Sequence, residues 1–219
     1  MPRPWLAFLS IGTIGVIVFV FYVLRLQPVQ APSLELEKTD TVATLTAPIV
    51  TFVNPAKGSS TPTVTIVEYG DFECEPCKQN ADAIDVVLRT YPDDVRVVWK
   101  DMPNESTHPV STPAAIAAHC ADRQGKFWEY HDALFAQQSV LDESMFIPIA
   151  SAIGLNTDSF SSCYAARDTL PIVKRDFNEG LALGIIATPT TYINDISYVG
   201  ALTADELIRY VQQAKTATK

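Results

Sequence analysis

A pair of cysteines two residues apart joins a strand-like segment to a helical one, and this junction constrains the fold most. Residues 64–67 form a short, mostly β-branched run that is typical of a buried strand, and Gly70 breaks it. Residues 77–90 then place apolar side chains about 3.6 residues apart, which predicts an amphipathic helix. Cys74 and Cys77 are therefore expected on the first turn of that helix.

The start of a helix changes the chemistry of a thiol. An unperturbed cysteine has a pKa near 8.5, so only about 3% of it is thiolate at pH 7. Free backbone N–H groups and the positive end of the helix dipole stabilise the thiolate of Cys74. Cys77 lies one turn further along the same face, so it can close a disulfide with Cys74 and resolve a mixed disulfide there. Pro76 fits between them because first-turn amides have no intrahelical acceptor.

The pair therefore predicts thiol–disulfide exchange, which needs no cofactor other than the Cys74–Cys77 disulfide itself. Other uses of such a pair are as zinc ligands or as an inert disulfide. A structural zinc site needs a second Cys/His pair at matching spacing, and the sequence contains none.

Composition narrows the class of protein and its compartment. The formal net charge of −9 argues against a nucleic-acid partner. Four cysteines, an even number, are compatible with two disulfides in an oxidising compartment. A length of 219 residues, 47% of them hydrophobic, is enough for one domain with a sizeable core plus an appendage.

The N-terminal region reads as a membrane anchor. Residues 5–24 carry no charged side chain, and as a helix they would span about 30 Å, the thickness of a bilayer core. We expect an anchor at residues 1–25, a linker at 26–48 and the folded domain at 49–219, with a cleaved signal peptide as the alternative to the anchor. The redox chemistry places the folded domain on the extracytoplasmic side of the cell membrane.

The remaining pattern predicts an α/β domain. A second buried strand at 95–100 completes a parallel strand–helix–strand crossover. Helical patterns follow from about residue 112 to 184, then a hairpin at 190–199 and a final helix at 203–214. A short edge strand is expected at Ile49–Val53.

Three motifs, in this order of elements, resemble the DsbA-like thiol–disulfide oxidoreductases of bacterial envelopes. They are residues 68–77, Cys120-Ala with Gln124–Asp132, and Ala187–Thr190. The resemblance covers residues 63–214, about 70% of the chain. It implies a thioredoxin fold with an inserted helical subdomain at about residues 105–175.

The resemblance also implies roles for residues outside the cysteine pair. Glu68 matches a buried acid beneath the disulfide; burial would raise its pKa, and it could take the proton of Cys77. Pro189 matches a cis-proline next to the disulfide, where the backbone of Thr188 would pair with an extended substrate strand. Lys100 is expected either beside Glu68 or as an exposed lysine at the strand end.

The other two cysteines, Cys120 and Cys163, match a structural disulfide seen in some members, and two buried free thiols are the alternative. One departure concerns the active-site pair, because the best-known oxidases have a histidine between the cysteines. Glu75 and Pro76 stand there instead, and negative charge near Cys74 should raise the pKa of that thiol. A milder oxidant is therefore expected.

The expected function is a membrane-anchored disulfide oxidase that acts on cysteine-containing client proteins and is reoxidised by a quinone-linked membrane protein. An isomerase or a reductase would use the same chemistry in another direction. A copper-binding module is the alternative from another class, with Met102 or His108 as a third ligand to the two thiolates. His119 and His131 are expected to be packed or surface residues.

Overall fold

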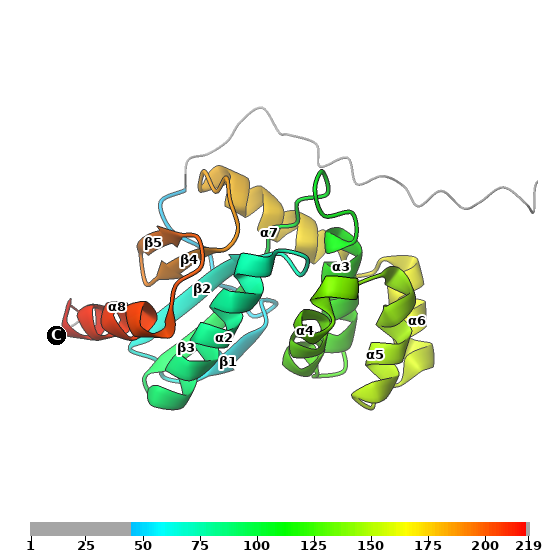
Figure 1. Ribbon diagram of the computed structural model, residues 1–219, viewed down its shortest axis with the longest axis horizontal. Helices are drawn as coiled ribbons and strands as arrows, with labels where there is room; N and C mark the ends of the chain where they lie inside the picture. Colours follow the sequence, from blue (N-terminus) through cyan, green and yellow to red (C-terminus); the bar gives the residue numbers. More distant parts are fainter. Residues whose placement is uncertain (1–44, 218–219) are drawn as a thin grey trace, which may run out of the picture. The chain divides into compact units, whose positions relative to one another are not determined.

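A five-stranded sheet forms the centre of the computed structural model, which describes residues 45–217 (Figure 1). Its strand order is β1-β3-β2-β4-β5, and β2 and β3 are parallel while the other neighbours are antiparallel. The strands are β1 (Ala56–Gly58), β2 (Val64–Gly70), β3 (Val95–Asp101), β4 (Thr190–Ile193) and β5 (Ile196–Val199). The predicted parallel crossover is therefore confirmed, with helix α2 (Glu75–Thr90) between β2 and β3.

Helices cover both faces of the sheet. Helix α2 and the C-terminal helix α8 (Ala204–Ala217) pack on one face, where Ile66, Val87 and Leu207 share an apolar cluster. Helix α7 (Leu170–Ala182) packs on the other face, against a cluster that includes Val67, Tyr69 and Val98. Alternation along β2 produces this division, because successive side chains of a strand point to opposite faces.

A helical subdomain follows β3 in the chain and lies beside the sheet in Figure 1. It consists of α3 (Ser111–Asp122), α4 (Phe127–Ala136), α5 (Phe146–Ala152) and α6 (Thr157–Ala166), with short 3₁₀ turns at η1 (Gln138–Val140) and η2 (Glu143–Met145). Its core continues into the sheet domain, where Phe72 stacks on Trp99 with ring centroids 4.9 Å apart. This arrangement confirms the predicted α/β thioredoxin-like fold with a helical insertion.

The predicted edge strand was misplaced. It lies at Ala56–Gly58, paired with β3, rather than at Ile49–Val53. The earlier residues instead run beside α7, where the backbone N–H of Ile49 donates to Glu179. A turn then closes, with the N–H of Asn54 donating to the carbonyl of Thr51, and it ends any extended run before a ladder can form.

The predicted anchor and nearly all of the predicted linker lie outside the described residues. Within residues 45–217, no helix combines the length and apolar character needed to cross a bilayer.

Candidate active site

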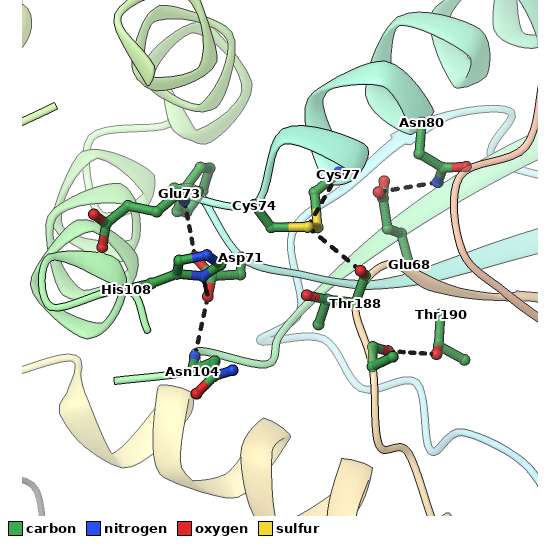
Figure 2. The surroundings of a disulfide bond; sticks show 12 residues. Glu68, Asp71, Glu73, Cys74, Cys77, Asn80, Asn104, His108, Thr188 and Thr190 are labelled. Atoms are coloured by element: carbon green, nitrogen blue, oxygen red, sulfur yellow. Dashed lines mark hydrogen bonds and ion pairs between the residues drawn. A yellow bond between two sulfur atoms is a disulfide. The ribbon is translucent and has the colours of Figure 1, made fainter. Parts of the chain in front are cut away.

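The Cys74–Cys77 disulfide lies at the N-terminus of α2 (Figure 2). The helix begins at Glu75, so Cys74 is its N-cap rather than a residue of the first turn. The backbone N–H of Cys77 donates to Sγ of Cys74 over 3.3 Å. The same N–H also donates to the carbonyl of Cys74 over 2.9 Å. An N-cap side chain normally accepts from a first-turn N–H, and a thiolate is a stronger acceptor than a thiol. Both cysteines are nearly fully buried, with Cys74 4% exposed.

The loop before β4 lies directly against this disulfide. The carbonyl oxygen of Thr188 is 3.4 Å from Sγ of Cys74, and the Thr188–Pro189 peptide bond is cis. The loop is held from both sides, because Thr190 Oγ1 donates to the carbonyl of Ala187 and the N–H of Gly200 donates to the carbonyl of Pro189, each over 2.8 Å. The structure thus brings Thr188 and Pro189 to the cysteine pair, 114 residues distant in sequence.

Glu68 lies near the end of β2 with its side chain turned toward α2. It is 2% exposed, and Asn80 Nδ2 donates to its Oε1 over 3.0 Å (Figure 2). Burial raises the pKa of Glu68 from 4.5 to about 7, while the Asn80 hydrogen bond partly opposes the rise. A carboxyl group with this pKa is present in both forms near neutral pH, so it can either take or give a proton there.

Lys100 does not lie beside Glu68, and it is not exposed. Glu68 is opposite Trp99 in the β2–β3 ladder and Lys100 is opposite Tyr69, so the two charged side chains leave opposite faces of the sheet. Lys100 is fully buried, with Nζ 2.9 Å from Glu179 Oε2 and 3.3 Å from Asp176 Oδ1. Both sequence-based expectations for Lys100 are therefore wrong, because α7 supplies two carboxylates that draw the lysine into the core.

An acidic turn next to Cys74 ties a second loop to the site. The buried carboxylate of Asp71 accepts from the N–H groups of Glu73 and Asn104 and lies 2.8 Å from Nδ1 of His108. Figure 2 shows Asp71 facing His108 and Asn104. The sequence did not lead us to expect these contacts of Asp71. An aspartate bonding the N–H two residues on is a common turn device, so that part was detectable.

Gln138 is a further site residue that the sequence did not reveal. Its Nε2 donates to the carbonyls of Phe72 and Cys74, over 2.9 and 3.0 Å, and so holds the turn that carries the first cysteine. Of the two residues between the cysteines, Glu75 and Pro76 are both exposed. Their predicted influence on Cys74 remains a prediction.

The second cysteine pair lies away from this centre. Cys120 on α3 and Cys163 on α6 form a disulfide with an S–S distance of 2.01 Å and both residues buried. It links two helices of the subdomain. Neighbouring His119 is also buried, but its Nε2 lies 2.6 Å from Asp101 Oδ2 rather than toward the sulfur. His131 is buried as well, among the rings of Phe72, Trp99 and Phe135.

One cluster of potential metal ligands occurs within residues 45–217, formed by Asp101, His119 and Asp176. It contains neither active-site cysteine, and the ammonium group of Lys100 already lies beside Asp176. It therefore fits a buried ion-pair network better than a cation site. Met102 and His108 also have partners other than the dithiol, since Met102 packs with Tyr69 near Gly180 and His108 meets Asp71.

Comparison with known proteins identifies the family. The family model described as thioredoxin matches residues 52–213. Among curated proteins, the Na(+)/H(+) antiporter NhaA 1 of Mycolicibacterium vanbaalenii is 36% identical over 154 residues, which is 69% of this chain and 25% of that protein. NhaA 3 of Salinispora tropica is 30% identical over 93% of this chain and 32% of its own length. The chain thus spans only about a quarter to a third of the curated relatives it matches.

Solved structures give the same fold. A thioredoxin-like oxidoreductase from Silicibacter pomeroyi has a TM-score of 0.70 and 25% identity, over 76% of this chain and 94% of that one. BdbD from Bacillus subtilis has a TM-score of 0.68 at 22% identity, over 75% and 94%. Alpha-DsbA2 from Wolbachia pipientis, a thiol-disulfide exchange protein, has a TM-score of 0.65 at 21% identity, over 74% and 87%. This chain belongs to the thioredoxin family.

Proposed function

We propose that this thioredoxin-family protein is a DsbA-like thiol–disulfide oxidoreductase that works as a disulfide oxidase on cysteine-containing client proteins outside the cytoplasm. The observation that carries the proposal is the contact between the reactive disulfide and the proline loop, 3.4 Å from Cys74 Sγ to the Thr188 carbonyl. A sulfur at a helix N-terminus next to a backbone carbonyl can be attacked by a client thiol while the client backbone pairs with the loop.

Client oxidation takes two displacements. A client thiolate attacks Sγ of Cys74, the Cys74–Cys77 bond breaks, and the Cys77 thiolate takes a proton from the carboxylic acid of Glu68. A second client thiolate then attacks the client sulfur of the mixed disulfide and releases the Cys74 thiolate, which the helix N-terminus stabilises. Two electrons pass from the client dithiol to the enzyme, and the client leaves with a new disulfide.

Reoxidation follows the same path with an oxidised partner. The Cys74 thiolate attacks the partner's disulfide, and the Glu68 carboxylate takes the proton of Cys77. The Cys77 thiolate then attacks Sγ of Cys74, and the partner leaves reduced. We propose a quinone-linked membrane protein as this partner. An anchor at residues 1–25 would raise the local concentration of the domain near such a protein.

Client recognition in this proposal is by backbone. A client segment in extended conformation would form hydrogen bonds with the main chain at Thr188, next to Pro189 and opposite Cys74, which tolerates many client sequences. A second disulfide, Cys120–Cys163, would brace the helical subdomain without taking part in exchange.

Trapping tests this proposal. In cells, Cys77→Ser should accumulate mixed disulfides on Cys74, because the resolving thiol is missing, and the bound proteins should be secreted or envelope proteins with cysteines. Cys74→Ser with Cys77 intact is the matched control and should trap nothing. A Cys77→Ser protein that carries no Cys74-dependent adduct would exclude thiol exchange with clients. Adducts enriched in proteins with misplaced disulfides would favour the isomerase alternative.

A further inference from the structure

Asn80 is an amide in a place where packing alone would favour an apolar residue. It lies on α2 three residues after Cys77, so both side chains leave the same face of the helix, one turn apart. It is fully buried between the helix and the sheet. A buried amide is costly unless its hydrogen bonds are made, by about 1–3 kcal/mol for each unsatisfied group.

The hydrogen bonds of Asn80 reach three different elements. Its Nδ2 donates to Glu68 Oε1 on β2 over 3.0 Å and to Thr191 Oγ1 on β4 over 3.1 Å. Its Oδ1 accepts from the backbone N–H of Leu202, before α8, over 3.0 Å. Glu68 and Thr191 are opposite each other in the β2–β4 ladder, so the side-chain amide of Asn80 links two neighbouring strands to helix α2.

We propose that Asn80 is a positioning residue that holds the carboxyl group of Glu68 in place for proton exchange with Cys77. This inference rests on the proposed function, in which Glu68 gives a proton to Cys77 or takes one from it. The hydrogen bond from Asn80 to Thr191 also connects Glu68 to β4, the strand that begins one residue after Pro189. The side chain of Asn80 thereby fixes Glu68 relative to the helix that carries Cys77 and to the strand that follows the proline loop.

The bond also bears on the acidity of Glu68. An N–H donor favours the ionised carboxylate, so Asn80 opposes the burial that favours the neutral acid. Two other charged groups act on Glu68: Lys57 on β1 favours ionisation and Asp85 on α2 opposes it. These two are paired with each other at 2.7 Å and partly exposed, so their effects on Glu68 largely offset.

The test uses two readouts on Asn80→Leu, a nearly isosteric change. The first is a ¹³C NMR titration of glutamate carboxyl groups in the oxidised protein, where neither active-site cysteine titrates. The second is the pH–rate profile for oxidation of the reduced protein by excess oxidised glutathione. Losing a hydrogen bond to a charged group should move the Glu68 midpoint up by about one pH unit or more. Oxidation should then be about tenfold slower at pH 6 and little changed at pH 9.

Controls separate positioning from loosened packing. Thr191→Val removes another partner of Asn80 but leaves the Glu68 bond, so the midpoint should stay in place. Asn80→Ala should show the same alkaline shift and serves if the leucine variant does not fold. Glu68→Gln identifies the carboxyl resonance of Glu68 and should remove from the pH–rate profile the limb that this carboxyl group causes. The double variant Glu68→Gln, Asn80→Leu should show the same profile as Glu68→Gln alone.

The outcomes are distinguishable. If folded Asn80 variants leave the midpoint unmoved while Glu68→Gln removes the limb, the inference about Asn80 is wrong and the proposed role of Glu68 stands. If Glu68→Gln leaves the rate profile unchanged, Glu68 does not exchange protons with Cys77. The proposed role of Glu68 and the inference about Asn80 are then both wrong.

Discussion

The buried carboxyl group of Glu68 should make the stability of this protein depend on pH in an unusual direction. Its pKa is 4.5 in an unfolded chain and about 7 in the folded protein, because burial disfavours the charge. The folded state therefore holds the proton more tightly, and the resulting stabilisation is complete below pH 4.5 and lost as the pH rises through 7. Each pKa unit is worth about 1.4 kcal/mol, so the loss should be about 3 kcal/mol.

Replacing Glu68 by Gln isolates this effect, since glutamine keeps the shape and an acceptor for Asn80 but never ionises. We expect the variant to gain about 3 kcal/mol of unfolding free energy over the wild type between pH 4 and pH 9. Urea denaturation of the oxidised proteins at both pH values measures the gap, and all other titrating groups cancel in the difference.

A control of opposite sign is available at the surface. The pKa of Glu206 is lowered by hydrogen bonds from Thr203, so that carboxylate stabilises the protein above its unfolded pKa and loses this effect on acidification. Glu206→Gln should therefore be less stable than wild type at neutral pH and approach it in acid. A difference in unfolding free energy between wild type and Glu68→Gln that stays constant from pH 4 to pH 9 would refute the raised pKa of Glu68. It would also remove the support for proton exchange by this carboxyl group near neutral pH.

Three further changes test other parts of the structure. Replacing Cys120 and Cys163 by alanine should lower the free energy of unfolding by about 4 kcal/mol in the chain-entropy model, while the exchange rate at Cys74 stays the same. An unchanged free energy of unfolding in urea titrations would contradict a stabilising role for this disulfide. Lys100→Met removes the buried ammonium group from Glu179 and leaves Asp176 with the partly exposed Arg175, so it should cost about 3–5 kcal/mol. Lys57→Met is the control, because Lys57 and Asp85 form a partly exposed ion pair whose loss should cost about 0–1 kcal/mol of unfolding free energy. Equal losses in the two variants would refute the argument that burial makes the Lys100 ion pairs the more costly to break. Glu75→Gln should make the protein a stronger oxidant by on the order of 10 mV, measured against glutathione buffers, and a shift toward a weaker oxidant would contradict the charge argument.

The sequence was most informative where the determinants are local. The cysteine pair, its helix and the following strand lie within about 30 residues, and periodicity with helix-capping chemistry was enough to predict them. The hairpin and the final helix are also short-range, and both formed as expected. A capping box of Thr203 and Glu206 marks the start of that helix.

The site residues that sequence reasoning missed are held by partners far away in the chain. Gln138 reaches Cys74 across 64 positions, and Asn80 reaches Thr191 across 111. Nothing in the local sequence marks such a pair, because the contact exists only after the sheet and the helices have assembled. The error on Lys100 has the same origin, since its carboxylate partners come from α7, 76 and 79 residues later.

The two sets of buried charge in this domain also distinguish structural from chemical roles. On the α7 face, Lys100 meets two carboxylates, and Asn54 and Tyr69 donate further hydrogen bonds to them, so each charge is compensated. On the α2 face, Glu68 receives one side-chain hydrogen bond, from Asn80, and burial dominates its pKa. A compensated network stabilises one geometry at every pH near neutrality. The undercompensated carboxyl group of Glu68 is bonded to Asn80, one helical turn from Cys77, and it costs stability once it ionises. The proposed use of its proton gives that cost a physical reason.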